Sequence, residues 1–358
     1  MRKKSADINP ENSVAPQENS LHIPVLLQEV IALLSPNSNG VYVDGTLGGG
    51  GHTLAIAQKI QEDREIRENS KIDPPAKNME KSGIIIAMDR DIDAINRSEK
   101  RLSKILSNKI TSPDNNPNNP NNNTVNKTFP VRFAHANYQY LDEVLDLLQI
   151  SQIDGFLLDL GLSGDQLADN ERGFSFDSTG LLDLRFDTSE GKPAYELLEK
   201  LSEKEIADII YQFGEERYGK RIARAIAERR KTGKPVRTAC ELAELVRRHV
   251  PREHRTRTKH HSQNIHPATR TFQALRIAVN DELGSLESVL KTAPNRLKPN
   301  GVIVVISFHS LEDRIVKNAF RNNPHWEIIT PKPLTPSDNE LKQNPRARSA
   351  KLRAARKQ

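Results

Sequence analysis

Four apolar runs along the chain lack the polar alternation of a half-exposed strand. They are "GVYVDGT" at 40–46, "GIIIAMDRD" at 83–91, "IDGFLLDLGLS" at 153–163 and "LKPNGVIVVISFHS" at 297–310. Continuous apolar runs of this length are typical of strands covered on both faces, as in a parallel sheet flanked by helices. Helical patterns lie between several of the runs, for example at 93–106 and 140–149. Together they predict βαβ units and an α/β fold with a doubly wound sheet.

Residues 165–268 interrupt this pattern, because they contain no strong strand signal and several helix starts. Two possible capping boxes, Ser202 with Glu205 and Thr238 with Glu241, precede apolar residues at helical spacing. We therefore expect a small all-helical domain inserted into the sheet domain. The chain then returns along one predicted helix at 271–290, whose apolar stripe is expected to pack in a core.

Three further segments complete the predicted organisation of the chain. Residues 1–20 are polar and irregular, and the insert at 111–127 is rich in Asn and Pro, so neither can bury a core. We predict a disordered N-terminal tail at 1–20 and a basic C-terminal tail at 326–358. The sheet domain is then formed by 21–164 and 269–325, and the helical domain by 165–268.

The positive charge of the chain is concentrated rather than large. The net charge is +6, yet residues 247–261 hold six Lys and Arg against one Glu, and residues 341–358 hold seven against none. Such blocks favour a polyanionic partner, although a solvated surface and a disordered tail explain them equally well. A single cysteine, Cys240, excludes an intrachain disulfide, and no apolar stretch reaches the roughly 18 residues of a membrane span. We expect a cytoplasmic protein without a membrane partner.

The glycine-rich stretch "VYVDGTLGGGGHT" at 41–53 lies where a ligand would approach bare backbone. A phosphate-binding P-loop needs a lysine after its glycines, but His52 and Thr53 stand there. The dinucleotide fingerprint fails too, because its third glycine is replaced by Thr53. Asp89, at the end of the second strand, can accept hydrogen bonds from ribose hydroxyls. The combination favours an adenosyl ligand without a diphosphate, of which S-adenosylmethionine is the common one.

Five longer segments carry a family resemblance. They are "HIPVLLQEV" (22–30), "VDGTLGGGGHT" (43–53), "IDGFLLDLGLSGDQLADNERGFSFDSTGLLDLRFD" (153–187), "IHPATRTFQALRIAVNDEL" (265–283) and "VISFHSLEDRIVK" (305–317). In this order they resemble the bacterial family of S-adenosylmethionine-dependent small-subunit ribosomal RNA cytosine-N4 methyltransferases, the H type. The resemblance covers about residues 21–320 and the "RARSAKLR" near the C-terminus. It implies a class I methyltransferase fold (Rossmann-like) with an inserted helical domain, and methylation of N4 of a cytidine in the decoding region of 16S rRNA.

The resemblance also implies which residues contact the cofactor S-adenosylmethionine: Gly50, Gly51, His52, Asp89, Tyr138, Asp159 and Gln166. At Tyr138 the family more often has Phe, and either ring offers an aromatic face to adenine. One segment departs from the family pattern. In "DLGLSGDQ", Gly164 and Asp165 replace Ser and Pro, which puts in doubt any essential role of the missing serine.

The N4 amine of cytosine is a poor nucleophile, because its lone pair is delocalised into the ring. An enzyme can accept hydrogen bonds from the amine and hold its nitrogen in line with the methyl group, and no metal is required. Ser163 and backbone carbonyls of the loop at 159–166 are the candidate acceptors, and the role of Asp159 is divided between cofactor and substrate. His309 is a candidate to take the released proton, although a capping role explains it equally well. The tempting "DPPA" at 73–76 ends in Ala rather than an aromatic residue, and we interpret it as an ordinary loop.

Several residues of the helical domain are candidates for contacts with RNA. Phe174 and Phe176 could stack on an unstacked base, or pack beneath the inserted domain. Arg172, Arg185 and Arg270 are the candidate phosphate contacts. Four histidines lie among arginines in one segment: His254, His260, His261 and His266. No carboxylate or thiol ligands stand at suitable spacing, so we interpret this segment as a basic RNA-facing loop rather than a metal site.

The expected partner is 16S rRNA or the small ribosomal subunit, and a homodimer stays open. Two other functions also stay open at this point. One is a methyltransferase that acts on DNA or protein. The other is a non-catalytic RNA-binding or ribosome assembly factor that retains a cofactor pocket, for which the residues at 164 and 165 are the only support.

Overall fold

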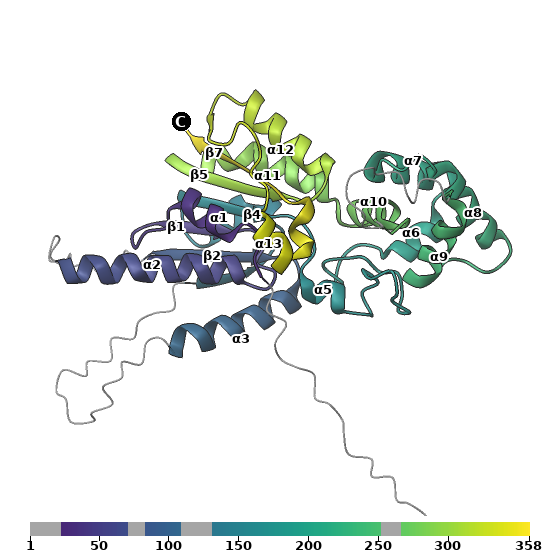
Figure 1. The fold of residues 1–358 in the computed structure, drawn as a ribbon, viewed down its shortest axis with the longest axis horizontal. Coiled ribbons are helices and arrows are strands. Elements are labelled where there is room, and N and C mark those ends of the chain that lie inside the picture. The colour runs from purple at the N-terminus through teal and green to yellow at the C-terminus, as the bar shows by residue number, and fades with distance from the viewer. Residues whose placement is uncertain (1–22, 71–82, 109–130, 252–265) are drawn as a thin grey trace, which may run out of the picture.

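A computed structural model describes residues 23–70, 83–108, 131–251 and 266–358 (Figure 1). The predicted N-terminal tail, the Asn/Pro-rich insert and the "DPPA" segment lie outside the described residues. So do His254, His260 and His261, so the structure does not test the predictions made for them.

Seven strands form one sheet, in the order β3-β2-β1-β4-β5-β7-β6. The first five in this order run parallel, whereas β7 runs antiparallel to both of its neighbours. This order, with its reversed seventh strand, is the class I methyltransferase architecture that the resemblance implied, so the predicted α/β fold class is confirmed. The strands are β1 (Val41–Asp44), β2 (Ile84–Asp89), β3 (Val131–His135), β4 (Ile153–Asp159), β5 (Leu297–Ser307), β6 (Trp326–Ile328) and β7 (Lys351–Lys357).

Helices cover both faces of the sheet, which explains the continuous apolar runs. On β4, Leu157 belongs to the core beneath α1, α2 and α3, whereas Phe156 and Leu158 belong to the core beneath α4, α11 and α12. No helix in the described part of the chain has the length and apolar character needed to cross a bilayer. The elements of the two layers are α1 (Leu27–Leu34), α2 (Gly51–Ser70), α3 (Ile92–Asn108), η1 (Tyr138–Tyr140), α4 (Leu141–Leu147), α11 (Glu282–Arg296) and α12 (Ser310–Asn322).

A helical unit stands beside the sheet, as the sequence predicted (Figure 1). It has a core of its own, which contains Ile206, Ile222 and Leu242. Both predicted capping boxes are formed, Ser202 with Glu205 and Thr238 with Glu241. The helices of this region are α5 (Gly164–Ala168), α6 (Ala194–Lys200), α7 (Glu203–Gly214), α8 (Gly219–Lys231), α9 (Ala239–His249) and α10 (Thr269–Asn280).

The predicted single helix at 271–290 is wrong. Asp281 adopts a left-handed backbone conformation with φ 46°, and it separates α10 from α11. Phe272 and Leu275 of α10 are buried in the core of the helical unit, whereas Leu286 of α11 is buried against the sheet. The chain therefore re-enters the sheet domain at Asp281 rather than at residue 269. A continuous apolar stripe could not reveal this break, because both halves of the stripe are buried.

The predicted basic tail at 326–358 is also wrong, because this segment completes the sheet. It forms β6, α13 (Asp338–Gln343), η3 (Pro345–Ser349) and β7, and β7 lies between β5 and β6. Leu352 and Ala354 of β7 are fully buried. The charge of Arg353 is accommodated by Asp313, whose Oδ1 lies 2.7 Å from Arg353 Nε.

Leu352→Ala is expected to lower the free energy of unfolding by about 2–5 kcal/mol, because it leaves a cavity in a fully buried strand. The matched control is Leu147→Ala, at the end of α4, where the leucine is 85% exposed and the expected change is below about 0.5 kcal/mol. Urea denaturation of both variants measures the difference. Equal midpoints for the two variants would contradict the assignment of β7 to the sheet.

Candidate functional site

A cavity of about 340 Å³ lies at the carboxyl ends of the central strands. This is the edge of an open α/β sheet where ligands bind, and the volume suits a small organic molecule. The glycine-rich loop after β1 forms one wall of the cavity. Residues at or after the ends of β2, β3 and β4 form the adjacent wall. The wall residues that the sequence predicted are Gly51, His52, Asp89, Tyr138, Asp159, Ser163 and Gln166.

The glycine-rich loop brings backbone to the cavity in conformations that favour glycine. Gly48 and Gly50 have φ +48° and +70°. A Cβ atom on Gly50 would lie 3.2 Å from Leu102 Cδ1 and 3.3 Å from Ser98 Cβ. Gly48 lines the cavity, but Gly50, which was predicted to contact the cofactor, turns the chain behind the wall. Side chains on this loop would fill the space that a ligand needs.

Asp89 stands at the end of β2, and its carboxylate is held by backbone N–H groups. Gly48 N–H donates to Oδ2 at 2.8 Å, and Asp91 N–H donates to Oδ1 at 2.9 Å. Burial raises the pKa of Asp89 to about 6, and the charges of Asp91 and Asp44 act in the same direction, whereas the two N–H donors oppose the shift. Each oxygen keeps a second lone pair, so the carboxylate can still accept hydrogen bonds from hydroxyl groups.

His52, which is buried, and Asp159, which is partly exposed, form a pair at the cavity wall. His52 Nε2 lies 3.4 Å from Asp159 Oδ2, an ion-pair distance without hydrogen-bond geometry. Burial acts to lower the pKa of His52, but the carboxylates of Asp159 and Asp44 outweigh it, and the net shift is upward. Neither ring nitrogen of His52 nor Oδ1 of Asp159 has a hydrogen-bond partner among the described residues. Such buried polar atoms are costly unless a ligand or water satisfies them.

The loop after β4, where this chain departs from the family pattern, is closed by side-chain hydrogen bonds. Ser163 caps α5 in a reciprocal capping box with Gln166, and Gly164 and Asp165 are the first residues of that helix. Gln166 Nε2 also donates to Asp91 Oδ2 at 3.1 Å. Gly164 and Asp165 are therefore compatible with a closed capping box at this wall of the cavity.

His309 has the capping role that the sequence left open. It is the N-cap of α12, forms a capping box with Glu312, and its Nε2 lies 3.0 Å from Glu312 Oε1. Phe308 and Glu312 line the cavity, but His309 does not. The position of His309 therefore favours the capping role over a role in proton transfer.

The positions of two residues, Arg172 and Phe174, argue against their predicted contacts with RNA, and the partners of a third, Arg185, reduce the support for its predicted contact. Arg172 is buried and bonded to internal carbonyls, and Phe174 is buried against Phe186 with ring centroids 5.7 Å apart. Arg185 is held by both carboxylate oxygens of Asp183. These arginines were predicted from charge alone, and the sequence could not show that their partners lie inside the fold.

Two of the predicted RNA contacts remain open. Arg270 is exposed, and its Nη1 donates to Glu215 O at 3.2 Å. Phe176 is half-buried, stacked on His266 with ring centroids 4.4 Å apart, and it meets Phe272 edge-on. Both side chains belong to the helical unit, so it remains the part of the molecule that we associate with RNA.

Sequence reasoning missed several residues that line the cavity, although most of them lie in the motifs quoted above. Phe186 comes from "LDLRFD", Glu282 from "NDEL" and Glu312 from "SLED". The two ends of the described chain also meet here, since Leu26 N–H donates to Glu340 Oε1 at 2.7 Å and residues 23–25 and 343–346 line the cavity. The described residues contain no group of three or more His, Cys, Asp or Glu side chains placed to hold a metal ion.

The cavity suits an adenosyl cofactor with an amino-acid end. Asp89 has lone pairs free to accept ribose hydroxyls, and the buried Tyr138 lines the same cavity with its aromatic ring. The α2 helix begins at Gly51, so its unpaired N–H groups lie at the wall that carries His52 and favour an anionic group such as a carboxylate. Fold and site together define a class I S-adenosylmethionine-dependent methyltransferase.

Comparison with known proteins agrees with this class. The model of the MraW methylase family matches residues 19–114 and 76–358, and the chain belongs to this family. It is 43% identical over 337 residues to "Ribosomal RNA small subunit methyltransferase H" of Rhodopirellula baltica, covering 94% of this chain and 91% of that protein. The protein of the same name from Sorangium cellulosum is 42% identical over 336 residues, with 94% and 90% covered.

Among solved structures, an rRNA methylase from Streptococcus thermophilus is similar over 92% of this chain and 91% of its own, with 9% identity and a TM-score of 0.37. This likeness is weak. The class therefore rests on the strand order, the cavity and the family.

The raised pKa of Asp89 predicts that cofactor binding depends on pH. Hydroxyl groups donate best to the ionised carboxylate, which protonates as the pH falls through about 6. We expect affinity for S-adenosylhomocysteine to fall about tenfold from pH 7 to pH 5, because the Asp89 carboxylate becomes protonated over this range. In the absence of ligand, the free energy of unfolding depends on pH in the opposite direction. A carboxyl group with a raised pKa stabilises the fold at low pH, and this contribution is lost as the pH rises through about 6.

Isothermal titration calorimetry across this range measures the effect, with Asp89→Asn as the variant that cannot titrate. A flat profile for the wild-type protein, or an unchanged slope in Asp89→Asn, would contradict the role given to this carboxylate.

Proposed function

We propose that this protein transfers a methyl group from S-adenosylmethionine to N4 of a cytidine in the decoding region of 16S rRNA. The names of the two relatives, which refer to the small-subunit ribosomal RNA, support the choice of substrate. One observation supports the proposed chemistry most directly. Asp159 lines the cavity, and its Oδ1 has no hydrogen-bond partner among the described residues. The proposed substrate implies a cytoplasmic location.

The cofactor would be held by the glycine-rich loop, Asp89 and Tyr138, and when bound it supplies a methyl group activated by a sulfonium. Asp159 accepts a hydrogen bond from the N4 amine and so directs its lone pair away from the carboxylate. As positive charge develops on the nitrogen, the carboxylate stabilises it and can take the proton that leaves. His52, whose Nε2 lies 3.4 Å from Oδ2, holds the other side of the carboxylate in place.

Ser163 has a narrower role in this proposal. Its Oγ accepts the Gln166 N–H at 3.2 Å, so its lone pairs are already partly used. Its hydroxyl proton remains available to donate to a ring acceptor of the base, which would help to orient the cytosine. Asp159 is therefore the acceptor in the reaction, and Ser163 is an orienting group.

The helical unit would carry the RNA beside the cavity. Arg270 is its candidate phosphate contact, and Phe176 is half-buried and stacks on His266. Phosphate contacts of this kind contribute affinity and register but no base specificity. Base recognition would fall to the cavity, where the walls after β4 and β5 meet.

The proposal is tested by incubating the protein with S-adenosylmethionine carrying a labelled methyl group and small ribosomal subunits from a strain without the modification. Digestion to nucleosides followed by mass spectrometry should give N4-methylcytidine from 16S rRNA. Duplex DNA and ribosomal proteins serve as competing acceptors in parallel reactions. Label in either of these, or label in no acceptor despite measurable cofactor binding, would sink the proposed substrate.

A further inference from the structure

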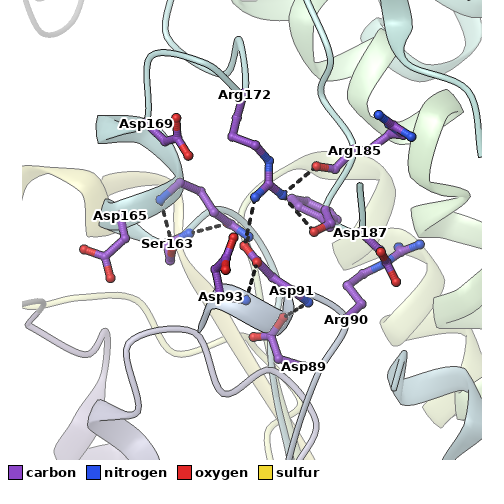
Figure 2. Close-up of polar contacts among 12 residues, drawn as sticks. Asp89, Arg90, Asp91, Asp93, Ser163, Asp165, Asp169, Arg172, Arg185 and Asp187 are labelled. Atoms are coloured by element: carbon purple, nitrogen blue, oxygen red, sulfur yellow. Dashed lines mark hydrogen bonds and ion pairs between the residues drawn. The ribbon is translucent and has the colours of Figure 1, made fainter. Parts of the chain in front are cut away.

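Arg172 lies at the junction between the helical unit and the sheet domain, and no part of the proposed chemistry uses it. Its Nη2 donates to the carbonyl oxygens of Arg185 and Phe186, each at 2.8 Å. Its Nη1 lies 3.6 Å from Asp91 Oδ2. Figure 2 shows the guanidinium between these groups, with the Asp91 carboxylate on the side of the sheet domain.

Asp91 is the partner on the sheet side, and it connects three parts of the cavity wall. It is 2% exposed and follows β2, where its backbone N–H donates to Asp89. Its Oδ1 accepts the Asp93 N–H at 3.1 Å, at the start of α3. Its Oδ2 accepts from Gln166 Nε2, and so fixes the loop after β4. A single buried carboxylate therefore links the ribose side of the cavity with the Asp159 side.

On the other side, Arg172 fixes the backbone that carries Phe186. Phe186 lines the cavity, and its ring stacks on Phe174. The Arg90 guanidinium lies over the same ring, with its Cζ 5.6 Å from the ring centroid. Phe186 N–H donates to Asn280 Oδ1 at 2.8 Å, just before the chain re-enters the sheet domain. Its carbonyl is one of the two that Arg172 holds, so the wall formed by Phe186 depends on both units.

We propose that Arg172 is a positioning residue that couples the helical unit to the cofactor cavity. Its planar guanidinium holds Phe186 from one side and, through Asp91, Gln166 from the other. Lysine cannot replace it, because one ammonium group does not present several fixed N–H donors to two carbonyls and a carboxylate at once. Arg172 touches no substrate in this account, and it acts by shaping the walls against which the adenosyl group lies.

Arg172→Lys is expected to weaken binding of S-adenosylhomocysteine roughly tenfold, the ratio that corresponds to one lost hydrogen bond to a charged group. In turnover assays the KM for S-adenosylmethionine should rise by the same factor, while kcat at saturating cofactor changes less than about threefold. Arg296→Lys is the matched control. Arg296 also bonds two carboxylates, Asp142 and Asp146, but it lies away from the cavity. Its variant should bind the ligand normally.

A double-mutant cycle separates positioning from a general loss of stability. Asp91→Asn should weaken binding to a similar degree, and the double variant Arg172→Lys with Asp91→Asn should be no weaker than the worse single variant. Additive losses, or unchanged affinity in folded Arg172→Lys protein, would overturn the proposal. If Arg172→Lys does not fold, Asp91→Asn decides alone, and wild-type affinity in that variant is the overturning result. Because binding is measured without RNA, this outcome is independent of the proposed rRNA substrate.

Discussion

Asp159→Asn is expected to lower kcat at saturating cofactor by a factor of about 100 or more, the range found when an acid–base group is removed. The amide keeps the size of the side chain but loses the negative charge that would stabilise the developing positive charge on the amine. Asp159 lines the cavity, and His52 Nε2 lies 3.4 Å from its Oδ2, so the side chain should stay in place. Single-turnover methylation of small subunits measures the chemical step separately from product release.

The matched control for this experiment is Asp154→Asn. Asp154 lies on the same strand, β4, but near its other end, where it accepts the Val41 N–H at 2.7 Å and pairs with Lys298. The same substitution there changes the charge of the protein equally and should leave kcat unchanged. A comparable loss in both variants, or no loss in Asp159→Asn, would refute the role of Asp159 as acceptor.

Asp89→Ala should weaken binding of S-adenosylhomocysteine by a factor of about 10 to 150, because a hydrogen bond to a charged group contributes roughly 1.5–3 kcal/mol. In the protein without ligand the substitution has two opposed effects on stability at neutral pH. Burial raises the pKa of Asp89 to about 6, so the ionised carboxylate is itself unfavourable in the fold. Its removal also leaves the N–H groups of Gly48 and Asp91 without their acceptor, so thermal denaturation of the unliganded variant is measured beside its affinity.

Asp93→Ala controls for the removal of an acid from the same turn. Asp93 is exposed at the start of α3, and it takes part in the network of Figure 2 through its backbone N–H, which donates to Asp91. Its side chain can therefore be removed without altering the cavity. Calorimetry should give wild-type affinity for this variant, and an unchanged affinity in Asp89→Ala would refute the ribose assignment.

The sequence predicted the strands that lie in the middle of the sheet, because burial on both faces leaves an uninterrupted apolar run. It failed for β7, whose sequence "KLRAARK" resembles a solvated tail. The strand is possible because small alanines and Leu352 face the cores, while Asp313 neutralises Arg353. β3 was missed for a related reason, since it lies at the edge of the sheet and keeps Arg132 exposed.

The parts of the site that depend on local backbone conformation were predictable from the sequence. The glycine-rich loop and Asp89 follow from strand ends and from the conformations that glycine permits. Arg172 was assigned to RNA because a charged side chain normally stays in solvent. Its partner Asp91 is distant in sequence, and such pairings depend on how the two units dock, which no local pattern encodes. His309 was ambiguous for the same reason, because only the structure shows that its ring caps α12 and stays off the cavity wall.

Mass spectrometry of 16S rRNA from cells with and without the gene is the most direct test of the proposed reaction. Oligonucleotides from the decoding region should carry one methyl group on N4 of a cytidine in wild-type cells and lose its mass in cells without the gene. The mass should return on expression of the wild-type protein but not of Asp159→Asn. Identical decoding-region masses with and without the gene would contradict the account.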